Sequence, residues 1–528
     1  MKKAILFLLL AAMLLSALAS CQSGGDGKTT EAVTVPQTEA ETAAETQPET
    51  DVSVDPAEEA AAFDALVADI GGATVENEKA IDEAYLTYWT MSEEARAAST
   101  QYDRLQTLRS ELTKAYVVKQ YKDTRIPHER FIIGVYHIPA STDQTLQALV
   151  DCKVDFVWGG GDHELLRKYG LGTFESAWSF YPISTKLTEE EARAAVKEKS
   201  VDDDLIWAVD HIDEPTAFEL PKYWVSGKVY SEEAFPESAY LANLLPFYVG
   251  DSEEDGEGYR QYLKRYLETF GSENDYISFD HYLYVTAENP HGGGNQLSAF
   301  LANLHMVSQA CNENGKEMLV ILQSMDVWKP DGGEGYYTVS ANMMRFQAYT
   351  AMAFGAKGIC WYAPYTWKHF MINEDGTKNE NFDKFYEADG DVKSLEPIFM
   401  RYTADSNAVI SGERALVNTK LDAYWGSKDP DNLKQDAVTG LTTNEKGAAL
   451  IGHFTKNIGE GDGFMIVPLS NTNFQQKKEQ TVSVSFETTD PEAVVTAYCK
   501  GVPTRLIPVE GVYTVELHNI DAVFVTVE

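Results

Sequence analysis

From about residue 125 to residue 410, short apolar runs alternate with helical stretches, and this alternation limits the possible folds more than any other feature. Eight apolar runs occur, each of the length of one strand. They lie at 131–136, 154–158, 177–181, 205–209, 242–248, 276–279, 318–322 and 358–362. Because strands that alternate with helices usually pair in parallel, the pattern predicts repeated βα units around a parallel sheet.

The stretches between these runs carry the apolar spacing of helices. Helices are predicted at 142–150, 189–199, 259–270, 297–312 and 341–354. Thr188 and Glu191 form a capping box in front of one of them. Eight strands with intervening helices predict a closed (β/α)8 TIM barrel at residues 123–410. An open doubly wound sheet needs fewer strands and a glycine-rich phosphate turn, which this chain lacks.

Two further folded segments flank the predicted barrel, as the length of 528 residues allows. Residues 56–122 carry helical periodicity and predict a small helical module that acts as a spacer. Residues 411–528 show short β-like runs separated by turn residues, which predicts an antiparallel β-sandwich. The predicted fold class is therefore α/β, with a helical module before the barrel and a sandwich after it.

The N-terminus has the features of an export signal. Lys2 and Lys3 precede an apolar run at 4–18 that is too short to span a bilayer as a helix. The run ends in Leu-Ala-Ser-Cys21, which resembles the bacterial lipobox. The resemblance implies that residues 1–21 are a lipoprotein signal, that Cys21 is lipidated, and that the protein is membrane-anchored at the bacterial cell surface, outside the cytoplasm. Residues 22–55 are polar and acidic and predict a disordered tether.

The charge excludes one class of partner. The chain has 82 acidic and 43 basic residues, a net charge of -39, which repels nucleic acid and favours solubility. No nucleic acid is expected as a partner, and the folded part is expected to be a monomer.

The ends of the predicted strands are rich in aromatic and polar side chains. In a barrel of this kind the C-terminal strand ends form the mouth where ligands bind. The candidate substrate-binding residues are Tyr136, His137, Trp158, Trp178, Asp213, His281, Tyr282, Gln323, Trp361 and Tyr362. Because sugar rings stack on aromatic faces and their hydroxyls pair with polar groups, this set predicts a carbohydrate ligand.

The segment Ile212-Asp213-Glu214-Pro215 follows the fourth predicted strand. A fourth strand that ends in Glu-Pro resembles the clan of retaining (β/α)8-barrel glycoside hydrolases that includes cellulase-like and family 42 β-galactosidase-like enzymes. The resemblance implies that Glu214 is the general acid/base of a glycosidase that cleaves O-glycosidic bonds. Such an acid is needed because the glycosidic oxygen leaves poorly unless it is protonated.

The sequence departs from that clan at two positions. Asp213 stands where the clan has an asparagine, and Gln323 stands at the end of strand seven where the clan has its nucleophilic glutamate. The second catalytic carboxylate is therefore sought at Asp280 or Asp326. A carboxyl separation of about 5 Å predicts a retaining enzyme, and about 6.5 to 9.5 Å an inverting one.

Two other classes of lipoprotein fit parts of the pattern. A non-catalytic glycan-binding lipoprotein on a degenerate barrel is the main alternative, and Gln323 favours it. A solute-binding lipoprotein would instead show two similar lobes. No cofactor is predicted, and no metal site, since the histidines lack a ligand spacing such as HExxH.

Overall fold

The computed structural model describes most of the chain. The described residues are 55–180, 183–197, 203–247, 257–284, 296–324, 339–364, 370–373, 375–413, 433–469, 481–518 and 521–528. They fall into two compact units, Met1–Leu108 and Arg109–Glu528. The predicted signal, Cys21, the tether up to residue 54, and Asp326 lie outside the described residues.

The first unit is helical. It contains α2 (Pro56–Ala68), η1 (Val75–Asn77), α3 (Glu78–Thr90), α4 (Glu93–Ala98) and the start of α5 (Tyr102–Ala115). Ser92 caps α4 by accepting a hydrogen bond from the Ala95 amide. Asp64 of α2 accepts hydrogen bonds from Ser99 and Thr100, which fixes the turn between α4 and α5. Phe63, Val67 and Ile81 are fully buried, so the helical periodicity read from the sequence corresponds to a small packed core.

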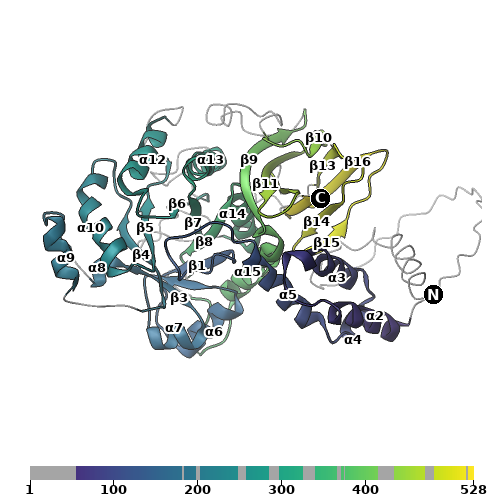
Figure 1. Ribbon diagram of the computed structural model, residues 1–528, viewed down its shortest axis with the longest axis horizontal. Helices are drawn as coiled ribbons and strands as arrows, with labels where there is room; N and C mark the ends of the chain where they lie inside the picture. Colours follow the sequence, from purple (N-terminus) through teal and green to yellow (C-terminus); the bar gives the residue numbers. More distant parts are fainter. Residues whose placement is uncertain are drawn as a thin grey trace, which may run out of the picture. The chain divides into compact units, whose positions relative to one another are not determined.

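The second unit contains a closed barrel of eight parallel strands in the order β1 to β8 (Figure 1), which confirms the predicted TIM barrel. The strands are β1 (Ile132–Tyr136), β2 (Phe156–Trp158), β3 (Gly172–Ser176), β4 (Ile206–Asp213), β5 (Ala239–Leu244), β6 (Tyr276–His281), β7 (Glu317–Gln323) and β8 (Ala356–Tyr362). β1 pairs with both β2 and β8, and these two ladders close the barrel.

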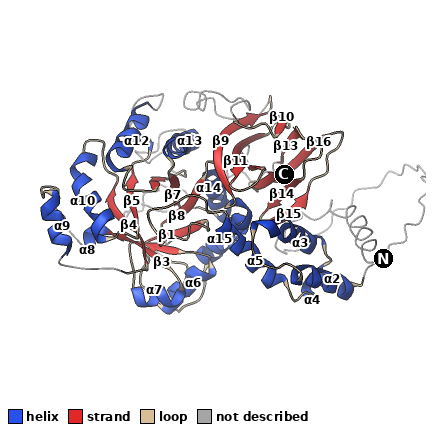
Figure 2. Ribbon diagram, in the orientation of Figure 1, coloured by secondary structure: helices blue, strands red, loops and turns tan. Residues whose placement is uncertain are grey.

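Helices follow the strands and lie outside them (Figure 2). They are α6 (Asp143–Asp151), α7 (His163–Tyr169), α8 (Ala177–Phe180), α9 (Glu189–Lys197), η2 (Leu220–Tyr223), α10 (Trp224–Val229), η3 (Tyr230–Ala234), α12 (Glu257–Phe270), α13 (Gln296–Asn314), α14 (Ala341–Ala353) and α15 (Glu380–Phe399). The predicted capping box is present, because Thr188 and Glu191 exchange hydrogen bonds between side chain and backbone amide.

Two predicted strands are shifted along the chain. The third strand is Gly172–Ser176, and the predicted run at 177–181 instead begins α8. This strand has one large apolar residue, Phe174. Gly172 packs against the indole of Trp207, where a Cβ would lie 2.2 Å from the ring. The fifth strand, Ala239–Leu244, starts before the predicted 242–248 and ends before its last residues. A hydrophobic pattern does not specify where pairing with the neighbouring strands stops.

Two antiparallel sheets follow the barrel, as predicted. The larger has the order β15-β14-β17-β12-β11-β9 and the smaller β10-β13-β16. Their strands are β9 (Tyr402–Ser411), β10 (Val438–Thr443), β11 (Ala448–Lys456), β12 (Asp462–Pro468), β13 (Thr481–Thr488), β14 (Val495–Cys499), β15 (Val502–Arg505), β16 (Val512–His518) and β17 (Val523–Val527). β9, which the sequence analysis places in the barrel segment, pairs with β11 in the larger sheet.

The larger sheet buries both of its faces. Ala449 and Ile451 of β11 pack with residues of the smaller sheet, which forms the sandwich core. Leu450 and Phe454 belong to the cluster that includes the barrel helices. α14 is buried along almost its whole length because it lies between the barrel and this sheet (Figure 1). One face of the larger sheet therefore shares a hydrophobic cluster with the helical layer of the barrel, and its other face forms the separate core of the sandwich.

Within the described part of the chain, no helix is both long enough and apolar enough to cross a membrane.

Candidate active site

Strand alternation brings acidic side chains from β4 and β6 to the barrel mouth. The interior of the barrel is filled by alternate residues of each strand, among them Ala208 of β4 and Tyr276 of β6. Asp210 and Asp280 lie an even number of positions further along these strands, so they share the inward face. Both carboxyl groups lie near the C-terminal strand ends, where (β/α)8 barrels bind substrates.

The backbone changes conformation where β4 ends. The pairing of β4 with β5 shifts register between Asp210 and Asp213, and Glu214 follows with a φ of 47°. A non-glycine residue in this left-handed region is strained by roughly 1 to 2 kcal/mol. The amide of Glu214 donates to the carbonyl of Asn243 at 2.8 Å, which fixes the turn against β5. Register shifts and strained residues of this kind concentrate at functional sites.

Glu214 and Asp280 form a carboxyl pair. A hydrogen bond joins their side chains. Asp280 is only 3 % exposed, whereas Glu214 is exposed to solvent. Burial, followed by the negative charges of Glu214 and Asp213, raises the pKa of Asp280 well above its usual value. The pair therefore joins an accessible carboxyl group to a buried one whose protonated form is favoured.

Asp213 is held in place from β5. The side-chain amide of Asn243 donates to a carboxylate oxygen of Asp213 at 3.0 Å, and its oxygen accepts from the hydroxyl of Ser278 at 3.2 Å. Asp213, Asn243 and Ser278 thus link the ends of three neighbouring strands, β4, β5 and β6. This link orients Asp213 toward the carboxyl pair.

Asp210 lies deeper in the barrel. The indole N–H of Trp158 donates to it at 3.3 Å. Burial and the charge of Asp213 raise the pKa of Asp210 to about 7, and the hydrogen bond from Trp158 opposes this rise. Burial and the charges of Asp213 and Asp210 also raise the pKa of Tyr136. The phenol of Tyr136 is therefore close to both carboxyl groups and remains neutral.

Aromatic rings lie on the other side of the barrel at its C-terminal end, and one of them, that of Trp158, is buried. Tyr136 of β1 has its ring centroid 5.5 Å from that of Trp158 on β2 and 5.3 Å from that of Tyr362 on β8. Tyr282, just after β6, lies 5.4 Å from Tyr362. Because β8, β1 and β2 are adjacent in the closed barrel, three of these rings form an arc on the side opposite the acidic ends of β4 and β6. We call Tyr136, Trp158 and Tyr362 the aromatic arc, and Tyr282 contacts it from the end of β6.

Two predicted site residues point away from the mouth. His281 alternates with Asp280, is fully buried, and its Nδ1 lies 2.9 Å from the side-chain oxygen of Asn303 on α13. Burial lowers the pKa of His281 to about 4, so it is neutral. Trp361 donates its indole N–H to Asp389 of α15 at 2.8 Å. Both side chains connect the strands to the helical layer.

The contacts of Gln323 are those of a residue that holds the backbone in place. It is fully buried, its side-chain oxygen accepts from the amide of Tyr284 at 2.7 Å, and its side-chain nitrogen donates to the carbonyl of Tyr284 at 3.0 Å. Gln347 of α14 in turn bonds both backbone groups of Gln323. The amide at the end of β7 therefore fixes the segment after β6. A carboxylate there would lack the donor that this carbonyl needs.

His137 and Trp178 lie at the rim. His137 has a φ of 59°, its ring centroid is 4.5 Å from that of Tyr136, and burial lowers its pKa. Trp178 is in α8 rather than at a strand end, and its side chain is partly exposed. His137 therefore contacts the aromatic arc, and none of the described ring contacts joins Trp178 to it.

Sequence reasoning missed Asn243 because of one strand boundary. The predicted strand at 242–248 puts Asn243 at a strand start, whereas β5 ends at Leu244 and places Asn243 at the mouth. The signal that marks this end is the sequence Asn-Leu-Leu-Pro, since proline cannot continue the ladder.

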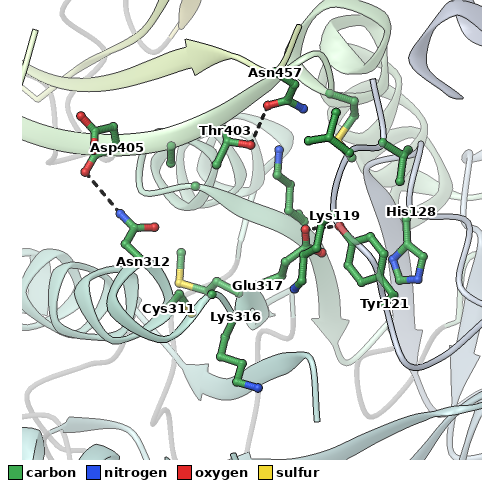
Figure 3. Close-up of a pocket in the computed structure, with 18 of the residues that line it drawn as sticks. Lys119, Tyr121, His128, Cys311, Asn312, Lys316, Glu317, Thr403, Asp405 and Asn457 are labelled. Carbon is green, nitrogen blue, oxygen red and sulfur yellow. Dashed lines mark hydrogen bonds between the residues drawn. The ribbon is translucent and has the colours of Figure 1, made fainter. Parts of the chain in front are cut away.

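Two cavities bear on where ligands bind. One, of about 730 Å³, begins at Glu214 and runs along α12. The other, of about 430 Å³, lies at the opposite, N-terminal end of the strands, beside Glu317 (Figure 3). Its polar side chains bond one another, as Tyr121 does to Glu317 and Thr403 to Asn457, and the ammonium of Lys316 points away to backbone carbonyls (Figure 3). The polar side chains around the second cavity therefore hold neighbouring elements of the fold together.

The acidic residues do not make an evident cation site. Among the described residues, no group of three or more histidine, cysteine, aspartate or glutamate side chains has the arrangement of metal ligands.

Comparisons with known proteins give similarity in structure only. No protein-family model matches the chain. No curated protein sequence matches it either. Among solved structures it is similar to a β-galactosidase from the psychrophilic Marinomonas ef1, at 11 % identity and a TM-score of 0.35 over 54 % of this chain and 63 % of that one.

Two further structures align over more of the chain. One is a family 51 α-L-arabinofuranosidase from Bifidobacterium longum, at 11 % identity and a TM-score of 0.37 over 78 % of this chain and 98 % of that one. The other is a glycoside hydrolase family 5 protein from Bacteroides vulgatus, at 10 % identity and a TM-score of 0.34 over 75 % and 89 %. Likeness at this level is too low to assign a function.

Proposed function

We propose that this protein is a surface-anchored glycoside hydrolase that cleaves O-glycosidic bonds in an oligo- or polysaccharide. The observation that carries the proposal is the hydrogen-bonded pair of Glu214 and Asp280 at the barrel mouth. Glycosidases need two carboxyl groups, one of them an acid at neutral pH. The aromatic arc opposite this pair supports sugar as the ligand.

In this proposal one proton serves both carboxyl groups. It moves from Asp280 to Glu214 across their hydrogen bond, which leaves Asp280 ionised and makes Glu214 an acid. Glu214 then protonates the glycosidic oxygen while Asp280 attacks the anomeric carbon, so the C–O bond to the leaving group breaks as a covalent glycosyl–enzyme bond forms. Glu214, now a base, takes a proton from the water that hydrolyses this intermediate.

The contact between the two carboxyl groups favours retention of configuration. A direct hydrogen bond is shorter than the roughly 6.5 to 9.5 Å separation that leaves room for an inverting water. The retaining separation of about 5 Å needs only a small displacement when the substrate enters. Asp280 is thus the preferred second carboxylate.

The proposal is tested with the full-length protein in detergent on a broad panel of plant and host glycans. Glu214→Gln and Asp280→Asn are each expected to lower kcat/KM by about a hundredfold or more. Glu219→Gln is the matched control, since the partly exposed Glu219 lies five residues further on and its side chain bonds only to Thr216 among the hydrogen bonds described. NMR of the first sugar released is expected to show the retained anomer.

The opposite outcome identifies the alternative class. If no glycan is cleaved but glycans bind equally to the wild type and to Glu214→Gln, the protein is a non-catalytic glycan-binding lipoprotein, and Glu214 is a contact residue.

Anchoring is part of the same proposal. The lipobox-like segment before Cys21 supports lipid attachment to this cysteine and a location at the bacterial cell surface. Cells grown with labelled palmitate are expected to label the wild type, and Cys21→Ser is expected to remain unlabelled. A labelled Cys21→Ser protein would refute attachment at this residue.

A further inference from the structure

A groove starts at Glu214 and leads away from the other acidic residues. Its volume is about 730 Å³, and of the four mouth carboxyl groups only that of Glu214 lines it. Asp210, Asp213 and Asp280 are not among its walls. A cavity of this size accommodates ligands larger than one sugar ring. The groove therefore extends the mouth on one side of Glu214.

The floor of the groove is held by hydrogen bonds. The hydroxyl of Tyr262 on α12 donates to the carbonyl of Pro215 at 2.7 Å and accepts from the amide of Leu245 at 3.3 Å. The hydroxyl of Tyr259 donates to the carbonyl of Leu245 at 3.0 Å. These bonds join the turn at Glu214, the end of β5 and α12, so the floor is formed before any ligand binds.

The long wall of the groove is one face of α12. Gly258, Gln261, Arg265 and Glu268 follow one another at helical spacing. Ten residues of helix extend over roughly 15 Å, which is longer than a single sugar ring. Lys264 lies 3.9 Å from Glu268. With Arg265 and Glu214, the groove is lined by two basic and two acidic side chains, so its net charge is small.

Phe218 stands at the edge of this groove with its side chain 84 % exposed, the highest value among the large apolar residues described. An exposed aromatic ring beside a polar groove is suited to stacking on the apolar face of a sugar. It lies four residues after Glu214, on the β4 to η2 loop whose turn is capped by Thr216 and Glu219.

We infer that this groove is a subsite for the leaving-group part of an uncharged oligosaccharide, with Phe218 as its stacking platform. The inference rests on the proposed function, because a general acid lies beside the glycosidic oxygen, which departs with the sugar that leaves. The leaving portion then lies on the side of Glu214 away from Asp280. The substrate is accordingly an oligosaccharide with several sugars beyond the cleaved bond, rather than a disaccharide.

The test compares long and short leaving groups in full-length protein. Hexasaccharides and disaccharides of the cello-, xylo-, manno- and β-1,4-galacto- series are assayed beside the glycosyl fluoride of the sugar that is cleaved. Fluoride is one atom and does not reach the groove. Phe218→Ala is expected to lower kcat/KM for the hexasaccharide about five- to tenfold, the size of one lost stacking contact, and to leave the fluoride unchanged.

Two variants control this result. Phe218→Trp keeps a stacking face and is expected to restore hexasaccharide cleavage. Tyr386→Ala removes another exposed aromatic ring, on α15 outside the groove, and is expected to change nothing. Equal loss on hexasaccharide and fluoride, or no loss on either, overturns the inference.

A failure of the proposed function is recognised separately. If the wild type cleaves no glycan, calorimetric titration of the four hexasaccharides into the wild type and Phe218→Ala still tests the groove. Weaker binding to Phe218→Ala supports the subsite without catalysis. Equal binding, or none to the wild type, contradicts it.

Discussion

Glu214 has a strained backbone conformation. Its carboxyl group is the more accessible one of the Glu214–Asp280 pair. Its φ of 47° suits glycine, yet the residue present is a glutamate. Strain of this kind lowers stability and is common at functional sites, which agrees with the catalytic role proposed for this side chain.

The strain predicts the order of stability of two variants that both lack the carboxyl group. Glu214→Gly should be more stable to unfolding than Glu214→Ala by about 1 kcal/mol, because glycine adopts positive φ without a steric cost. Urea denaturation monitored by circular dichroism measures the difference. Equal midpoints for the two variants would show that this φ carries no strain.

Asp210 predicts a pH dependence of stability. Its pKa is raised to about 7 in the fold, above the ordinary value that applies to the unfolded chain. The folded protein therefore binds this proton more tightly than the unfolded chain does. The contribution of this proton to the free energy of unfolding is fully present below about pH 4 and is lost as the pH rises through about 7. Asp210→Asn should remove this loss, since its side-chain oxygen still accepts from Trp158.

The measurement is the unfolding free energy at intervals from pH 4 to pH 8. The wild type should lose more stability across this range than Asp210→Asn, and the variant should be the more stable protein at pH 8. Parallel curves would mean that Asp210 is ionised throughout the range.

At the scale of elements, the end of β7 determines how the segment after β6 is held. Gln323 is both donor and acceptor to the backbone of Tyr284. The resemblance to glycosidases draws attention to this position as a missing nucleophile, but its contacts are those of a structural amide.

Gln323→Glu is therefore expected to destabilise the protein by about 1 to 3 kcal/mol and to give no gain in activity. The carboxylate would face the carbonyl of Tyr284 without a proton to donate, and the carbonyl would lose its partner. Thermal melting and glycan hydrolysis measure the two effects. An increase in hydrolysis would instead show that β7 retains a catalytic position.

At the scale of the whole second unit, barrel and sandwich are joined through α14 and β11. Gly452 of β11 lies against the C-terminal end of α14, where an added Cβ would be 2.0 Å from the carbonyl oxygen of Ala353. The contact is between two backbones, so neither side can yield by rotating a side chain.

Gly452→Ala is expected to destabilise both parts together by about 1 to 3 kcal/mol or more. Gly390→Ala is the matched control, because its Cβ would meet open space within α15 and should stabilise the helix by about 0.5 to 1 kcal/mol. Calorimetry distinguishes the cases. A Gly452→Ala protein in which the sandwich melts alone would mean that the shared hydrophobic cluster is weak.

The sequence by itself determined the architecture, because that depends on local patterns. Strand-length apolar runs that alternate with helical spacing specify a (β/α)8 barrel, and β-like runs after it specify a sandwich. The sequence also placed Glu214 directly after the fourth strand, because this assignment needs only the order of the strands along the chain.

Only the tertiary structure decided which side chains meet. The register shift after Asp210 turns Asp213 and Glu214 toward Asp280, and the end of β5 brings Asn243 beside them. Alternation along the strands sends His281 and Trp361 outward, although each adjoins a residue at the mouth. These outcomes depend on pairing between segments far apart in the chain. A local pattern of hydrophobicity contains no information on that pairing.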